Sequence, residues 1–240
     1  MHLFIVDIHI SLDCLAPIMY SLLKNKQKVI LLNIYPIHSY KEKKIVKLLL
    51  KNGLILKEYK SLSVKNLLIN FLIKILLLLP KSIICRKYIF WKTVYEKILF
   101  LSNNEIKKII IEDNIKSITI DESLVIKKQD FINFNSKKNN IPLIITATGL
   151  TTVEFPFTFT NKHFKYCDYY FMPNYFFSND LIDDKFKKKI KVFGSARYTK
   201  EWIHNLDLLD DIDNNQRNKK INIGIFTRQT GNVLTKNTPF

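Results

Sequence analysis

The sequence predicts an α/β fold in which helices cover both faces of one parallel sheet. The first observation is a series of short apolar runs that each end in a polar residue or a turn, and the second is that helical segments separate these runs. Parallel strands need a crossover connection, usually a helix, so this alternation indicates repeated strand–helix–strand units. The third observation is the glycine turn at Gly194, which follows the last run and leads into a helix near Glu201 and Trp202.

The first part of the chain predicts three strands and two helices. The polar stretch Ser11–Asp13 indicates a loop, and either Ser11 or Asp13 can cap the helix that contains Pro17. The second helix ends at Gly53, a residue suited to a helix C-terminus. The expected strands are Leu3–Asp7, Lys28–Tyr35 and Leu54–Glu58, and the expected helices are Pro17–Leu23 and Lys41–Asn52.

The segment Val64–Leu79 interrupts this alternation with an apolar run of about 13 residues that contains Asn70 and Lys74. A membrane-spanning helix needs about 20 residues, so spanning is disfavoured. Two interpretations stay open, a helix buried in the core and a helix that lies in a membrane interface. In the second, basic side chains would contact lipid headgroups; these are Lys65, Lys74, Lys81, Arg86 and Lys87. Another helix is expected at 82–101.

From residue 105 the alternation resumes. We expect strands at Ser117–Asp121, Pro142–Thr146, Asp168–Met172 and Lys189–Phe193, and helices at Glu105–Asn114, Lys127–Lys138 and Tyr175–Asp184, of which 127–138 is solvated. A run of Asp and Asn residues then indicates a connector between two domains. We therefore expect one domain over residues 1–206, a connector over 207–219 and, over 220–240, the first strand and loop of a truncated second domain.

Composition narrows the class of partner. The net charge is +17, and only four of the 38 basic residues are arginine. The bias toward lysine, isoleucine and asparagine is typical of an AT-rich genome, or else indicates attraction to an anionic lipid or sugar nucleotide. The lysines are spread along the chain without a nucleic-acid-binding motif, so no nucleic-acid partner is expected. Three distant cysteines predict neither disulfides nor a metal spacing, so we expect a reducing cytoplasm and no metal or cofactor.

Polar residues that follow the strands are the candidates for a ligand site, because ligands of parallel sheets bind beyond the carboxyl ends of the strands. After the first strand, Asp7, His9 and Asp13 are candidate catalytic residues, since a carboxylate or an imidazole can act as general base toward an acceptor hydroxyl. The candidate substrate-binding residues follow the later strands and are Asp121, Thr148, Gly149, Asn174, Gly194, Ser195 and Arg197.

Each candidate also has a structural interpretation. Asp121 can bond neighbouring loop amides, Gly149 can make a plain turn, and Arg197 can pair with a carboxylate at an interdomain turn. In the functional interpretation, Gly194 and Ser195 present backbone amides to a phosphate and Arg197 presents its guanidinium.

Three stretches of the chain carry a resemblance to known enzymes. They are Phe4–His9 followed by Leu15–Pro17, then Cys167–Asn174, and then Val192–Tyr198 with Glu201 and Trp202. Together they resemble glycosyltransferases of the GT-B architecture that build bacterial surface polysaccharides. The third stretch also resembles the interdomain turn of CDP-glycerol glycerophosphotransferases and of UDP-N-acetylglucosamine 2-epimerases. Where several relatives carry His-Gly, this chain has Thr148-Gly149.

The resemblance implies a Rossmann-like domain, the N-terminal and acceptor-side half of a GT-B fold. It implies a nucleotide-activated donor (a sugar or a polyol), a membrane lipid surface or lipid-linked acceptor, and a cytoplasmic location, peripheral on the inner face of the cell membrane. Because the second domain looks truncated, we expect the chain to be inactive unless a separate chain carries that domain. Two alternatives stay open: a sugar-nucleotide epimerase-like fragment, and a non-enzymatic basic membrane-binding module.

Overall fold

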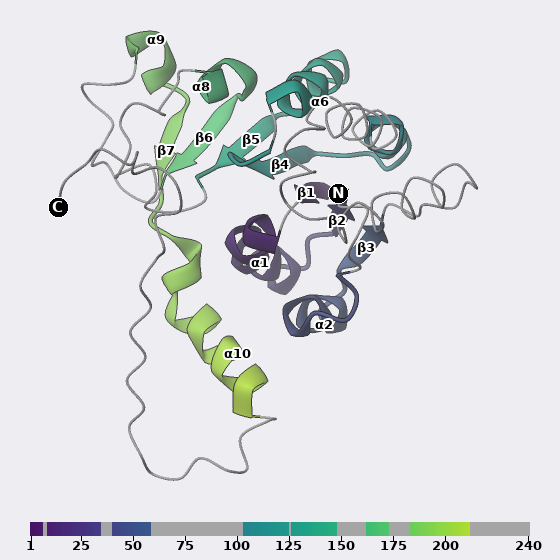
Figure 1. The fold of residues 1–240 in the computed structure, drawn as a ribbon, viewed down its shortest axis with the longest axis vertical. Helices are drawn as coiled ribbons and strands as arrows, with labels where there is room; N and C mark the ends of the chain where they lie inside the picture. The colour runs from purple at the N-terminus through teal and green to yellow at the C-terminus, as the bar shows by residue number, and fades with distance from the viewer. Residues whose placement is uncertain are drawn as a thin grey trace, which may run out of the picture.

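One parallel sheet organises the chain. The computed structural model describes residues 1–6, 9–34, 40–58, 103–124, 126–147, 162–172 and 183–211. Within them, seven parallel strands form one sheet in the order β3-β2-β1-β4-β5-β6-β7 (Figure 1). The strands are β1 (His2–Val6), β2 (Val29–Asn33), β3 (Ile55–Glu58), β4 (Ser117–Asp121), β5 (Leu143–Thr146), β6 (Tyr169–Met172) and β7 (Ile190–Val192). The predicted α/β fold with a Rossmann-like parallel sheet is confirmed.

The central strand β1 is buried on both faces. Leu3 and Ile5 belong to one hydrophobic core, and Phe4 and Val6 belong to another. This follows from the strand geometry, in which successive side chains point to opposite faces of the sheet. The parallel register sets Phe4 beside Leu31 of β2, which lies in the same core. A strand covered on both faces appears in the sequence as a continuous apolar run, which is why these strands were predictable.

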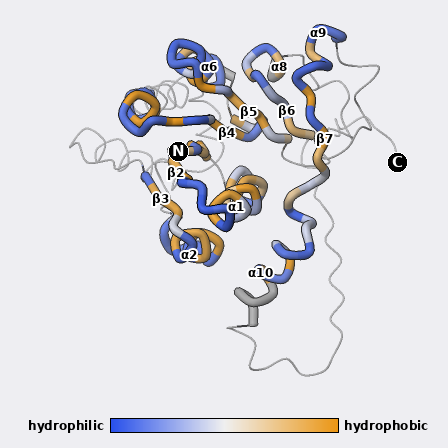
Figure 2. The backbone as a smooth tube through the Cα atoms, turned by 180° about the vertical axis from the view of Figure 1, so that it is seen from behind, coloured by the Kyte–Doolittle hydropathy of each residue, from blue (hydrophilic) through white to orange (hydrophobic). Residues whose placement is uncertain are grey.

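Two layers of helices cover the sheet. The core that holds Phe4 is closed by α1 (His9–Lys24), α2 (Lys44–Lys51) and α10 (Lys200–Asp211). The opposite core is closed by a helix over residues 103–112, by α6 (Ile126–Lys138) and by α8 (Lys162–Tyr166). Figure 1 shows these groups on the two sides of the sheet, and in Figure 2 apolar and polar stretches alternate along α1 and α2. Two short elements, α9 (Asp184–Lys187) and the 3₁₀ helix η2 (Ala196–Tyr198), flank β7.

The first helix begins earlier than predicted. The predicted loop Ser11–Asp13 is helical, because α1 starts at His9, and Pro17 lies inside the helix. Neither Ser11 nor Asp13 therefore caps it. The prediction took Pro17 as a first-turn residue, where proline is favoured. Packing overrides that local preference, because Leu12, which precedes Pro17 on α1, is already buried in the core at 3% exposed.

The helix α6 has its predicted place but not its predicted solvation. Lys128, Gln129 and Ser136 are each at most 1% exposed. Their polar groups are satisfied inside the protein: the Gln129 amide donates to the Leu124 carbonyl at 2.6 Å, and the Ser136 hydroxyl donates to the Asn133 carbonyl at 2.9 Å. Hydrogen bonds of this kind allow a polar sequence to be buried.

The remaining element predictions have mixed outcomes. Gly53 follows α2 with a φ of +94°, as a helix C-terminus predicts. Asp184 begins α9, whereas it was predicted to end a helix. The helix α10 extends to Asp211, so the start of the predicted connector is helical. The apolar segment Val64–Leu79, the helix at 82–101 and the strand at 221–226 lie outside the described residues.

None of the helices in the described ranges is long and apolar enough to cross a membrane.

Candidate functional site

The turn after β7 requires a glycine. Gly194 has a φ of +78°, which L side chains rarely adopt. A Cβ at this position would meet no atom within 4 Å. Glycine is therefore required by the backbone conformation and not by a lack of space. The chain then tightens into η2, where the Tyr198 N–H donates to the Ser195 carbonyl at 3.1 Å. Because η2 packs against α1, this turn carries Arg197 to the first helix.

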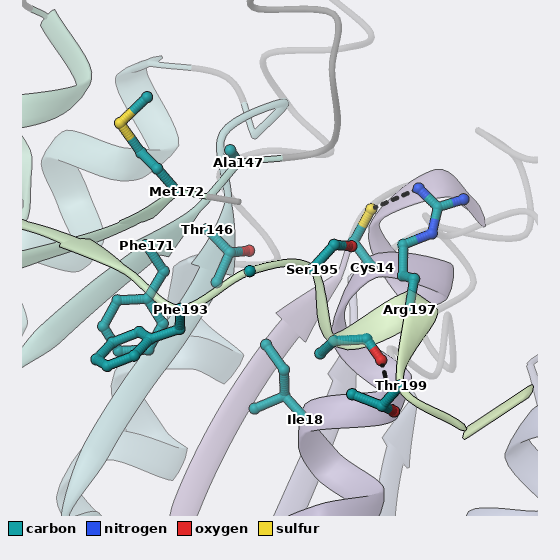
Figure 3. Close-up of a pocket in the computed structure, with 12 residues that line it drawn as sticks. Cys14, Ile18, Thr146, Ala147, Phe171, Met172, Phe193, Ser195, Arg197 and Thr199 are labelled. Carbon is teal, nitrogen blue, oxygen red and sulfur yellow. Dashed lines mark hydrogen bonds between the residues drawn. The ribbon is translucent and has the colours of Figure 1, made fainter. Parts of the chain in front are cut away.

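A pocket of about 280 Å³ lies at this turn, at the carboxyl edge of the sheet. Three parts of the chain form it: one face of α1, the ends of β5 and β6, and the turn from β7 into α10 (Figure 3). Its lining is mostly apolar. The residues are Cys14, Ile18, Thr146, Ala147, Phe171, Met172, Phe193, Gly194, Ser195, Ala196, Arg197 and Thr199.

One cationic side chain, Arg197, lines the pocket. Its guanidinium donates to Cys14 Sγ at 3.7 Å. Burial raises the pKa of the Cys14 thiol to about 11, and the positive charge of Arg197 only partly opposes this. Cys14 is therefore a neutral thiol at physiological pH and a weak acceptor for the guanidinium. A phosphate or carboxylate oxygen would be a much stronger acceptor at the same place.

Aromatic rings form another part of the wall. The rings of Phe171 and Phe193 lie 5.1 Å apart between centroids at 80°, an edge-to-face pair. Phe193 nevertheless remains 72% exposed. The two threonine hydroxyls of the pocket are directed to the backbone: Thr146 donates to the Ile120 carbonyl at 3.4 Å and Thr199 to the Ala196 carbonyl at 3.1 Å.

A second polar feature lies at the end of β4. Asp121 is 1% exposed, and its Oδ1 accepts hydrogen bonds from the Ser123 N–H, at 2.7 Å, and from the Ser123 hydroxyl. Ser11, in the first turn of α1, lies 3.4 Å from the Ser123 hydroxyl. The other carboxylate oxygen of Asp121, Oδ2, has no hydrogen-bond partner among the described residues. Burial raises the pKa of Asp121, against the opposing effect of the Ser11 and Ser123 hydroxyls.

The structure brings together only some of the predicted site residues. Gly194, Ser195 and Arg197 share the pocket. Asp121 bonds a loop amide, as its structural interpretation expected, and does not line the pocket. Asp13 is exposed on α1, and His9 begins that helix. Asp7, Thr148, Gly149, Asn174 and the His9 side chain lie outside the described part, so their roles stay predictions.

Sequence reasoning missed most of the apolar lining of the pocket, including Cys14 and Phe193. Cys14 and Ile18 are four residues apart on α1 and so share one helix face, but the predicted helix began too late to include Cys14. Phe193 directly follows β7, and the rule about strand ends would have selected it if apolar residues had been considered.

The arrangement is suited to binding. It offers an apolar wall, one guanidinium and a glycine turn. The lining thiol is a poor nucleophile, because attack requires a thiolate. Among the described residues, no group of three His, Cys, Asp or Glu side chains could hold a metal ion.

No protein-family model and no curated protein matches the chain. Among solved structures, the chain is similar to LpCGTa in complex with UDP, with 11% identity and a TM-score of 0.41 over 66% of this chain and 32% of that one. It is also similar to the glycotransferase of kitacinnamycin, with 12% identity and a TM-score of 0.46 over 81% of this chain and 51% of that one. The chain thus spans about a third of the first structure and about half of the second.

Proposed function

We propose that the chain is a glycosyltransferase-like protein that binds a nucleotide-activated sugar or polyol donor at the Gly194–Arg197 turn. The observation that carries the proposal is the pocket in which this turn meets α1 and the ends of β5 and β6. Ligands of open parallel sheets bind at that edge. A guanidinium matches the geometry of a phosphate, and every nucleotide-activated donor contains phosphate. The resemblance of Val192–Tyr198 to the interdomain turn of GT-B enzymes supports the same assignment.

The finer parts of the proposal rest on the sequence. The acceptor is held at a membrane, with Val64–Leu79 and its flanking lysines against anionic lipid on the inner face. The transferred group enters a surface polysaccharide. Asp7, His9 or Asp13 takes the proton from the acceptor hydroxyl. The second nucleotide-fold domain is supplied by further sequence or by a separate chain.

Calorimetric titration of the full chain with UDP-, CDP- and GDP-activated donors tests the proposal. We expect Arg197→Ala to weaken binding by roughly 10-fold or more, since hydrogen bonds to charged groups contribute about 1.5–3 kcal/mol. Lys191 is the matched control, because it is exposed on β7 and does not line the pocket. Lys191→Ala should leave the affinity unchanged. Failure of every donor to bind at millimolar concentration would overturn the proposal.

Two further assays test the reaction and the membrane. Adding a lipid-linked acceptor together with the second domain should release nucleoside diphosphate or monophosphate, whereas a change in the configuration of the donor sugar alone would indicate an epimerase. Co-sedimentation with anionic vesicles should be lost at high salt and in Leu72→Asp and Leu76→Asp variants. Absence of binding to any vesicle would remove the membrane-held acceptor from the proposal.

A further inference from the structure

We infer that the pocket takes the nucleoside-phosphate half of the donor, with the base against Phe193 and the phosphate at Arg197. This inference rests on the proposed function, because it names the part of the nucleotide-activated donor that enters the site. Two contrasting walls support it. In Figure 3 the rings of Phe171 and Phe193 lie on the opposite side of the view from Arg197, with Ser195 between them.

The size of the pocket selects a fragment of the donor. Its volume is about 280 Å³. Sites that enclose a drug-sized ligand usually have roughly 300–1,000 Å³. The pocket is therefore too small for a whole nucleotide-activated donor and takes only a part of it. The remainder of a nucleotide-activated donor, including the group to be transferred, would extend out of the pocket toward solvent.

The aromatic wall favours a base. Phe193 is 72% exposed, although Phe171 contacts it edge to face. Single exposed apolar side chains are common on protein surfaces. Phe193 differs from such a case because it lines the same pocket as the Arg197 guanidinium. A planar base can stack on an exposed ring whatever its hydrogen-bonding pattern.

The hydrogen-bonding capacity of the pocket disfavours a sugar ring at the same place. A buried sugar would need a partner for each hydroxyl, because an unpaired buried hydroxyl is costly. The Thr146 and Thr199 hydroxyls already donate to backbone carbonyls. Most of the other lining side chains are apolar, among them Ile18 and Met172. A base that stacks through its π-face needs no hydrogen-bond partner on that face.

The phosphate belongs at the opposite wall. There the guanidinium of Arg197 donates to a neutral sulfur, Cys14 Sγ, at 3.7 Å. A phosphate oxygen is a stronger acceptor and matches the planar fork of arginine. Phosphate binding therefore adds a charge-assisted hydrogen bond to Arg197, or replaces its weak contact with Cys14 by one, whatever other contacts Arg197 makes.

The test compares four probes by calorimetry on the full chain: nucleoside 5′-monophosphates, ribose 5-phosphate, geranyl phosphate and inorganic phosphate. We expect the best nucleotide to bind roughly 5-fold or more tighter than ribose 5-phosphate, as expected for one stacked base. Phe193→Leu keeps an apolar side chain but removes the ring. It should weaken nucleotide binding about 3- to 10-fold and leave ribose 5-phosphate unchanged.

Tyr198 provides the matched control. It is 70% exposed and lies five residues after Phe193, but it does not line the pocket. Tyr198→Leu should therefore leave nucleotide affinity unchanged. Because both rings are largely exposed, both variants should keep the wild-type unfolding temperature, which confirms that a lost affinity is not a lost fold.

The outcomes separate the inference from the proposed function. Equal affinities for nucleotide and ribose 5-phosphate would overturn the inference. A preference for nucleotide that survives Phe193→Leu would do the same. In both cases the proposed function stands as long as an activated donor binds. Tightest binding by geranyl phosphate overturns it in favour of a lipid phosphate. Binding of none of the probes and none of the donors refutes both. Nucleotide binding that depends on Phe193, without binding of any activated donor, refutes only the proposed function.

Discussion

Replacing Trp202 with alanine tests how α10 is attached to the rest of the domain. Trp202 is 3% exposed, and its ring lies 5.7 Å from the ring of Tyr20 on α1. Truncating a buried aromatic side chain to alanine costs about 3–5 kcal/mol. Domains of this kind are stabilised by about 5–15 kcal/mol in total. A single indole therefore accounts for a large fraction of the stability.

The other contacts between α10 and α1 are weaker. The Tyr20 hydroxyl donates to Asn205 Oδ1 at 3.2 Å, a bond whose net contribution is about 0.5–1.5 kcal/mol. Lys24 and Glu201 form an ion pair, but their side chains are 52% and 56% exposed, so solvent screens it. We therefore expect apolar burial to dominate the attachment.

Urea unfolding followed by far-ultraviolet circular dichroism measures these differences. We expect Trp202→Ala to lower the free energy of unfolding by about 3–5 kcal/mol, Tyr20→Phe by about 1 kcal/mol, and Glu201→Gln by the least. Because η2 directly precedes α10, Trp202→Ala should also lower the affinity of Arg197 for a phosphate ligand. A smaller loss for Trp202→Ala than for Glu201→Gln would refute this reasoning.

Three further predictions follow from single residues. Gly194→Ala and Gly53→Ala should each destabilise the fold by about 1 kcal/mol, since both have positive φ and open space, but in calorimetric titrations only Gly194→Ala should also weaken ligand binding. Burial and the nearby N-terminal charge lower the pKa of His2, so the unfolded chain binds the proton more readily, and thermal unfolding should show stability falling as the pH drops below about 6.5 and a flatter profile in His2→Gln. Because burial raises the pKa of Asp121, the folded state favours its protonated form; Asp121→Asn should raise the melting temperature at pH 7 and have less effect near pH 4.

The sheet was predictable because its strands are buried on both faces. The strand β4 has the predicted bounds, β1 begins and ends one residue earlier than predicted, and β2 is three residues shorter than its predicted run. The helices were harder to predict where the local sequence is misleading. Pro17 suggested a helix start in the middle of α1, and the polar composition of α6 concealed its buried face. In both helices the contacts with the sheet decide the outcome, and those contacts are not local in sequence.

The same distinction applies to the site. The glycine turn and Arg197 are consecutive in the chain, and their place after a strand was enough to predict them. Cys14 lies 183 residues away from Arg197 in sequence. Their contact depends on how α1 and η2 pack, which composition and periodicity do not encode. Local motifs therefore predicted the glycine turn and Arg197, whereas the contribution of α1 to the pocket required the fold.

Cys14 lies at the carboxyl edge of the sheet, near charged side chains of both signs. The negative charges of Asp121 and Asp13 raise the pKa of its thiol, whereas Arg197 lowers it. A phosphate at Arg197 would add negative charge beside Cys14 and would further favour the protonated, neutral form of its thiol. Cys14 would then stay a weak acceptor, and the phosphate would be the stronger partner for the Arg197 guanidinium.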